Sequence, residues 1–186
     1  GHLIYLSGEV GIGAGIIYDG KPMLGSAGYA GEVGHTLINP AGRRCRCGAT
    51  GCWETEAGEM ALARAAGLPA SITGLDVVRT VRDRAETGDQ RTLSGIAEIG
   101  RWLGLGIGSL INTFNPELIV LGGIYHALFP YVRPSVLEGA AMMRLDAPAA
   151  MVGDATSGDR EHPRPERRRV AFEGGDALGD GHPDLA

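Results

Sequence analysis

Several common features are missing from this sequence. It has no apolar run approaching 18 residues, no stripe of basic residues, and only three cysteines among 186 residues. A membrane-spanning helix needs a long apolar run, and no signal peptide is visible, so we expect no membrane contact. The net charge of -5 and the pI of about 5.5 argue against a nucleic-acid-binding surface on this chain. The composition indicates a soluble protein of the cytoplasm, where thiols stay reduced.

All three cysteines lie in one short stretch, together with a nearby histidine. The four residues are His35, Cys45, Cys47 and Cys52. Three thiolates and one imidazole are a common ligand set for structural Zn²⁺ and fill all four coordination positions. We therefore expect a zinc site in this loop. The alternative is free or disulfide-bonded cysteines, but three cannot all pair in one chain, and Cys45 and Cys47 are too close to bridge comfortably. Arg44 and Arg46 would favour the thiolate form.

Two carboxylates flank the cysteine stretch. Glu32 lies three residues before His35 in AGEVGH, and Glu54 lies two residues after Cys52 in CWE. Folding the loop around a metal would bring both carboxylates close to the imidazole. Carboxylates accept hydrogen bonds from sugar hydroxyls, and a metal-bound histidine presents one defined N–H. The cluster predicts a polyol-binding site, although either glutamate could instead be solvated or merely support the metal ligands.

The segments AGEVGH and CRCGATGCWE resemble the signature of the ROK family, which contains bacterial sugar kinases and sugar-responsive transcriptional repressors. The resemblance implies that His35 and the three cysteines bind zinc. It also implies that Glu32, His35 and Glu54 contact the sugar. The segment LSGEVGIG resembles regulators of this family from high-GC bacteria.

The resemblance extends from about residue 3 to about residue 140 and implies an α/β fold. The expected architecture is the C-terminal half of an actin-like, ribonuclease H-like ATPase fold with a zinc-binding loop. Residues 1–145 would form the sugar-binding lobe, truncated at its N-terminus, because the chain opens directly on a strand without a start methionine. Residues 146–186 are rich in Gly, Pro, Asp and Arg, so we expect a disordered tail.

Local patterns agree with this layout. We expect a strand over 3–6, a hairpin over 12–24 with a type I′ turn at Asp19-Gly20, and a buried strand over 118–121. Helices are expected over 56–66, 75–86 and 92–114. The last carries Gly104, Gly106 and Gly108, which suggest close packing against a strand or a ligand cleft, or else weaken the helix.

The loop after the first strand bears on phosphate transfer. In kinases of the family it usually reads Gly-Thr-Gly-x-Gly, and here it is Glu9-Val10-Gly11-Ile12-Gly13. Val10 lacks a hydroxyl, and Glu9 would repel the nucleotide phosphates. We therefore interpret the glycines as the remnant of a nucleotide loop and expect no ATP binding, although they could equally serve a hairpin. The remnant residues are Gly11, Gly13, Gly122 and Gly123, and no catalytic residue is assigned.

Three functions remain open. The first is the sugar-sensing part of a ROK transcriptional repressor with a structural zinc, a homodimer that would bind DNA only through a region absent from this chain. The second is a fragment of an ATP-dependent, glucokinase-like ROK sugar kinase, in which case the activity would be that of a hexose kinase. The third is a zinc-stabilised remnant that binds no ligand.

Overall fold

A mixed β-sheet forms the centre of the fold in the computed structural model, which describes residues 1–143, 151–154 and 169–172. The strand order is β3-β2-β1-β4-β6-β5. β1 pairs antiparallel with β2 and parallel with β4. The carboxyl ends of β1 and β4 therefore meet at one edge, where Gly8 faces Gly123. The strands are β1 (Leu3–Gly8), β2 (Ile12–Tyr18), β3 (Lys21–Pro22), β4 (Leu118–Gly123), β5 (Met151–Asp154) and β6 (Arg169–Phe172).

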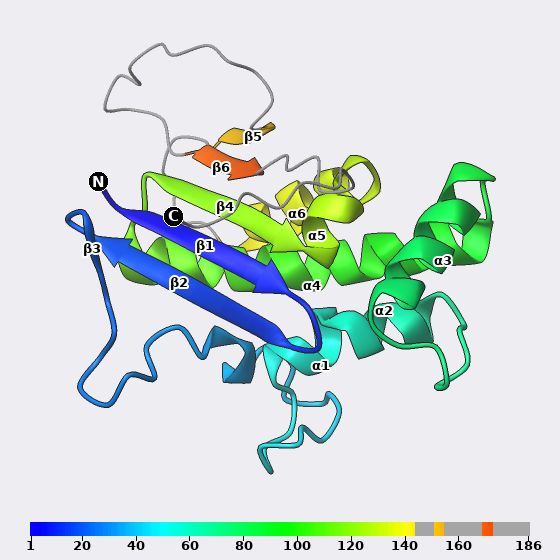
Figure 1. Cartoon of the computed structure of the whole chain (residues 1–186), viewed down its shortest axis with the longest axis horizontal. Helices are drawn as coiled ribbons and strands as arrows, with labels where there is room; N and C mark the ends of the chain where they lie inside the picture. The colour runs from blue at the N-terminus through cyan, green and yellow to red at the C-terminus, as the bar shows by residue number, and fades with distance from the viewer. Residues whose placement is uncertain (144–150, 155–168, 173–186) are drawn as a thin grey trace, which may run out of the picture.

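Helices pack behind this sheet, and the longest of them, α4, runs along its back (Figure 1). Apolar residues alternate along β1, so that Ile4 and Leu6 are buried. They belong to the same core cluster as Leu103 and Ile107 of α4. The helices are the 3₁₀ helix η1 (Val33–His35), α1 (Trp53–Ala57), α2 (Glu59–Ala65), α3 (Leu75–Glu86), α4 (Gln90–Phe114), α5 (Ile124–Ala127) and α6 (Phe129–Met142).

Most of the expected elements are present. Asp19 and Gly20 both have positive φ, as a type I′ turn requires, although β3 ends at Pro22 rather than at residue 24. The helix over 75–86 has the expected bounds. α4 begins two residues earlier than expected, because the carboxylate of Asp89 accepts a 2.7 Å hydrogen bond from the Thr92 N–H and caps the helix.

The single helix expected over 56–66 is wrong. The structure has two helices, α1 and α2, separated at Gly58, whose backbone is extended. A Cβ at this position would overlap with the carbonyl oxygen of Glu54. Glycine at position 58 therefore allows α1 to end and α2 to begin within one residue.

The glycines of α4 do allow close packing, but against helices rather than against a strand or a cleft. A Cβ at Gly104 would overlap with the Val136 carbonyl oxygen, and one at Gly139 with the Arg101 carbonyl oxygen. α4 and α6 therefore approach each other through glycine on both sides. Gly106 faces the ring of Trp53 in α1 instead.

The stretch from 146 to 186 contains the two short strands β5 and β6, which pair parallel with each other and extend the sheet beyond β4. These strands are not predicted by the sequence. The rest of this stretch lies outside the described residues, so the expected disorder stays a prediction there. None of the helices that the structure describes combines the length and the apolar character needed to cross a bilayer.

Candidate functional site

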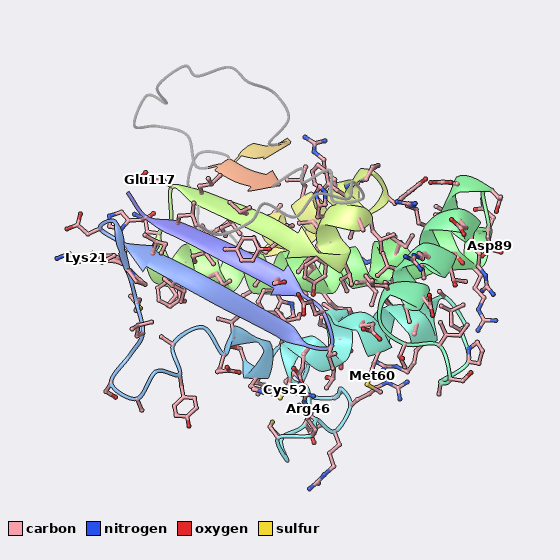
Figure 2. All side chains as sticks on the ribbon, in the orientation of Figure 1. Lys21, Arg46, Cys52, Met60, Asp89 and Glu117 are labelled. Atoms are coloured by element: carbon pink, nitrogen blue, oxygen red, sulfur yellow. The ribbon has the colours of Figure 1, made fainter. Side chains whose placement is uncertain are left out.

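The loop between η1 and α1 folds back on itself and gathers the cysteines. The N–H of Cys45 donates to the Ala49 carbonyl oxygen over 2.7 Å, and the N–H of Gly48 donates to the Cys45 carbonyl oxygen over 3.0 Å. Gly48 has φ of 98°, a conformation that other residues rarely adopt. This turn carries Cys45 and Cys47 back toward Cys52, which directly precedes α1. Cys52 and Arg46 lie near each other beside α1 (Figure 2).

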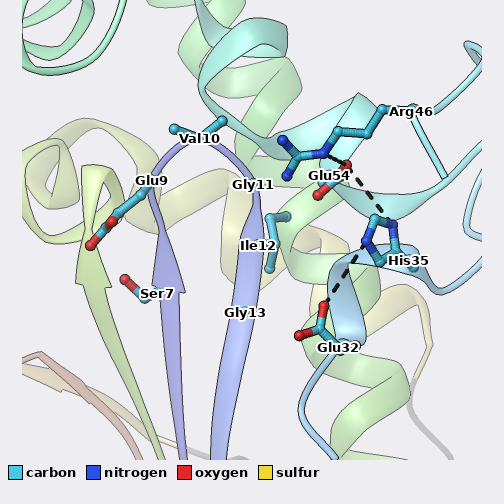
Figure 3. A pocket seen from close by; sticks show the side chains of 10 residues that line it. All are labelled: Ser7, Glu9, Val10, Gly11, Ile12, Gly13, Glu32, His35, Arg46 and Glu54. Atoms are coloured by element: carbon cyan, nitrogen blue, oxygen red, sulfur yellow. Dashed lines mark ion pairs between the residues drawn. The ribbon is translucent and has the colours of Figure 1, made fainter. Parts of the chain in front are cut away.

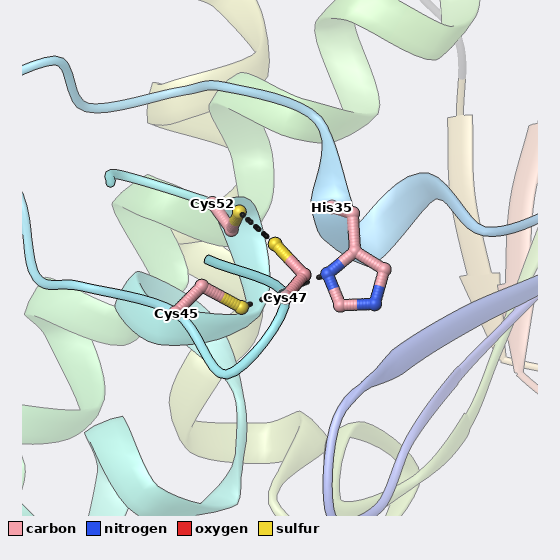
Figure 4. A group of neighbouring side chains, drawn as sticks. All are labelled: His35, Cys45, Cys47 and Cys52. Carbon is pink, nitrogen blue, oxygen red and sulfur yellow. Dashed lines mark hydrogen bonds between the residues drawn. The ribbon is translucent and has the colours of Figure 1, made fainter. Parts of the chain in front are cut away.

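His35 and the three cysteines point toward a common centre (Figure 4). Nδ1 of His35 lies 3.6 Å from Sγ of Cys45, and Sγ of Cys47 lies 3.6 Å from Sγ of Cys52. All four ligand atoms lie within 4.8 Å of one another. Thiolates about 2.3 Å from a tetrahedral zinc would be about 3.8 Å apart. The donor set and its spacing therefore fit a metal ion, and all three cysteines are free.

Burial disfavours the thiolate forms of Cys45 and Cys52 when no metal is bound. It raises the pKa of Cys52 to about 12, with further contributions from the neighbouring cysteines. Burial also raises the pKa of Cys45. The pKa of Cys47 is lowered, mainly by a hydrogen bond from the Ala49 N–H. A metal must therefore displace protons from the two buried thiols.

The two predicted carboxylates lie on either side of the imidazole. Oε2 of Glu32 is 4.0 Å from Nε2 of His35, and Oε1 of Glu54 is 3.9 Å from Nδ1 (Figure 3). The Cys45 thiol donates to the same Oε1 of Glu54 over 3.2 Å. The Glu32 side chain is 65% exposed, whereas that of Glu54 is only 11% exposed. The imidazole thus turns Nδ1 toward the cysteines and Nε2 toward Glu32.

A pocket of about 360 Å³ opens beside this cluster. It contains all three predicted sugar-binding residues and two of the four predicted glycines. Residues at and just after the carboxyl end of β1 line it, and this end of a strand is where ligands bind in α/β sheets. The lining residues are Ser7, Glu9, Val10, Gly11, Ile12, Gly13, Glu32, His35, Arg46 and Glu54.

Residues 9–11 form the short hairpin loop between β1 and β2. The N–H of Glu9 donates to the Gly11 carbonyl oxygen over 3.0 Å, so this donor is already used within the loop. A Cβ at Gly11 would overlap with Oε2 of Glu54. Gly13, in contrast, faces open space. Glycine at position 11 therefore allows the loop to approach Glu54 closely.

The other two predicted glycines do not line this pocket. Gly122 and Gly123 end β4 beside β1, where a Cβ at Gly122 would overlap with the Tyr5 hydroxyl. Gly123 has positive φ and abuts the Gly8 carbonyl oxygen. Their placement explains the tight turn into α5.

Sequence reasoning missed Arg46 as a pocket residue. Its Nε lies 3.6 Å from Oε1 of Glu54, and its guanidinium reaches beside Gly11. The sequence does place Arg46 between two metal-ligand candidates, Cys45 and Cys47. If the side chains of Cys45 and Cys47 point to the metal, the side chain of Arg46 between them can point away from it. This alternation of side-chain direction is the signal that could have identified Arg46 as a pocket residue.

The α/β fold and this site define a protein of the class that contains the actin-like sugar kinases. More specifically, the chain belongs to the ROK family, whose model matches residues 2–160. The family expected from the cysteine signature is thereby confirmed.

Relatives of known sequence include transcriptional regulators. The xylose repressor of Caldicellulosiruptor bescii is 38% identical over 138 residues, covering 64% of this chain and 33% of the repressor. The regulator NagC of Escherichia coli is 38% identical over 120 residues, covering 61% of this chain and 30% of NagC. The chain thus spans about a third of the length of these relatives.

Solved structures of both regulators and kinases are similar to the chain. A ROK family transcriptional regulator homologous to the E. coli MLC protein is 35% identical with a TM-score of 0.65, covering 77% of this chain and 38% of that one. A ROK family glucokinase from Streptomyces griseus, solved with glucose and AMPPNP, is 25% identical with a TM-score of 0.68, covering 92% of this chain and 55% of that one.

Proposed function

We propose that this chain is the sugar-sensing lobe of a ROK-family transcriptional repressor. The observation that carries the proposal is a single pocket in which Glu32, His35 and Glu54 meet a hairpin loop unsuited to nucleotide phosphates. The similarity to the xylose repressor and to NagC supports a regulator.

The proposed sugar contacts follow from the chemistry of the three side chains. Glu32 and Glu54 accept hydrogen bonds from hydroxyl groups. With Nδ1 committed to a metal, His35 keeps its proton on Nε2 and can donate it to a sugar oxygen. The lining contains three glutamates and, besides His35, one basic residue, Arg46. This negative balance favours an uncharged sugar over a sugar phosphate.

The hairpin loop supports a sensor rather than an enzyme. Glu9 brings a negative charge, and Val10, which is 64% exposed, offers no hydroxyl. Because the Glu9 N–H is bonded to Gly11, the loop also has one donor fewer for a phosphate. Phosphoryl transfer relies on positioning and electrostatic stabilisation of these phosphates.

We further propose that the metal is zinc and that its role is structural. His35 and the three cysteines would occupy all four positions of a tetrahedral sphere, which leaves none for a substrate. Bound zinc stabilises the loop that carries the sugar-binding residues. In the whole protein, we expect DNA binding to lie outside this acidic lobe and the protein to act as a homodimer.

The alternative is the sugar-binding half of a ROK kinase, which the similarity to the S. griseus glucokinase favours. The two proposals differ in nucleotide binding. We expect Mg²⁺-AMPPNP to leave the thermal midpoint of this chain unchanged, with sugar present or absent. A midpoint that rises with nucleotide concentration would favour the kinase.

Sugar binding is tested by titrating the metal-loaded chain with a panel of aldoses. A ligand at 100 times its Kd stabilises the native state by about 2.7 kcal/mol, which corresponds to a rise of about 5–10 °C in the midpoint at this chain length. The Glu32→Ala variant should lose this response and keep its metal. A Glu32→Ala variant that still responds would refute the assignment of Glu32. No response of the wild-type chain to any aldose would favour a remnant without a ligand.

A further inference from the structure

Arg46 lies between the metal-ligand candidates Cys45 and Cys47 in sequence, but its side chain points away from the cysteines and toward Glu54. The backbone turn of residues 45–48 points Cys45 and Cys47 toward the common centre, and Arg46 extends over Glu54 (Figure 3). Its Nε is 3.6 Å from Oε1 of Glu54, and one terminal nitrogen reaches beside Gly11. The guanidinium therefore bridges the cysteine loop and the hairpin loop.

Three groups approach the same oxygen of Glu54. The Cys45 thiol donates to Oε1 over 3.2 Å, Nδ1 of His35 is 3.9 Å away, and Nε of Arg46 is 3.6 Å away. A metal would take the Cys45 sulfur as a thiolate and would also take Nδ1, so neither could donate to Glu54. Arg46 is then the remaining partner of Oε1 among these three.

The environment of Glu54 makes this partner important. Its side chain is 11% exposed, in a pocket that also contains Glu9 and Glu32. A largely buried carboxylate is held in one orientation by a donor or a cation beside it. The planar guanidinium supplies both, and it leaves Oε2 turned toward the hairpin loop and the pocket.

We propose that Arg46 is a positioning residue, which holds the carboxylate of Glu54 in the orientation that accepts a sugar hydroxyl. The metal loop then contributes to ligand affinity through the residue between two of its cysteines. The inference depends on the proposed sugar site and names a residue of that site that is neither a metal-ligand candidate nor a proposed sugar contact.

The test compares three variants of the metal-loaded chain, using an aldose to which the wild type responds. Arg46→Ala should weaken sugar affinity about two- to fivefold, since the ion pair that holds Glu54 is lost and its arginine partner is exposed. Arg46→Lys should restore part of this loss, because it keeps the charge. Arg44→Ala is the matched control: Arg44 is exposed on the same loop but does not line the pocket, and its variant should bind sugar like the wild type.

Two further measurements separate positioning from damage to the loop. Arg46→Ala should keep its full metal content, and combining it with Glu54→Gln should weaken binding by less than the product of the two single effects. Wild-type affinity in Arg46→Ala, or effects that multiply fully, would overturn the role of Arg46 while leaving the sugar site intact. If no aldose of the panel raises the thermal midpoint of the wild-type chain, the sugar site itself is refuted.

Discussion

The indole N–H of Trp53 donates a 3.0 Å hydrogen bond to the carbonyl oxygen of Trp102. Trp53 stands between Cys52 and Glu54 in the sequence, and it is 1% exposed. α1 is therefore anchored to α4 by a residue that adjoins both a metal-ligand candidate and a sugar-binding candidate. The packing of Trp53 against α4 therefore contributes both to the stability of the core and to the position of the candidate site residues beside it.

Gly106→Ala tests this anchor. A Cβ at position 106 would overlap with three atoms of the Trp53 ring. Overpacking costs about 1–3 kcal/mol, and alanine regains about 1 kcal/mol of helix propensity, so we expect the free energy of unfolding to fall by about 1 kcal/mol. Urea denaturation measures the change. The control is Gly15→Ala, at an exposed position with ordinary contacts, and it should stay within about 0.5 kcal/mol of the wild type. Equal stability of the two variants would contradict the anchor.

Gly11→Ala tests the contact between the hairpin loop and Glu54. The new Cβ would overlap with Oε2 of Glu54, so the carboxylate must move and the sugar response should be lost. The cysteine cluster lies on the other side of Glu54, so metal content should be unchanged. Gly15→Ala again serves as the control, because Gly15 lies in β2, which follows the hairpin loop, but does not line the pocket. A thermal shift with sugar in Gly11→Ala equal to that of the wild type would show that Glu54 is not a sugar ligand.

Asp89→Asn tests the pH dependence of the cap on α4. The Thr92 side chain and the hydrogen bond that the Thr92 backbone N–H donates hold the pKa of the Asp89 carboxyl below its usual range. The carboxylate therefore stabilises the fold fully above the usual pKa of about 3.9, and this contribution is lost as the pH falls through the lower folded value. Asparagine can still cap the helix but does not titrate.

The wild type should accordingly lose stability relative to Asp89→Asn between pH 6 and pH 3. Urea denaturation of both proteins at each pH measures the difference, and the other titrating groups cancel in the comparison. A stability difference that is the same at both pH values would mean that the Asp89 pKa is not lowered by folding.

The sequence was a good guide wherever one residue type carried the chemistry. The three cysteines lie within eight positions, so their approach to His35 follows from the metal that their spacing predicts. Regular apolar periodicity likewise predicted α3 and most of α4. Glu32 and Glu54, the two carboxylates proposed to bind sugar, lie beside the cysteine stretch in sequence, and the structure places them on either side of the imidazole.

The sequence was a poor guide where distant packing decided the structure. α6 contains Pro134 and shows no clear apolar stripe, yet it forms because Gly139 and the glycines of α4 let the two helices pack closely. The break at Gly58 depends on a contact with the Glu54 backbone. Arg46 lies in a loop without periodicity, and its direction is set by the turn of its neighbours rather than by any pattern of its own.

Metal content tests the central claim most directly, since the metal is proposed to hold the loop that carries the sugar-binding residues. We expect elemental analysis of the purified, reduced protein to find about one zinc ion per chain, because four protein ligands complete one tetrahedral coordination sphere. A protein that folds and responds to sugar without stoichiometric metal would contradict the account.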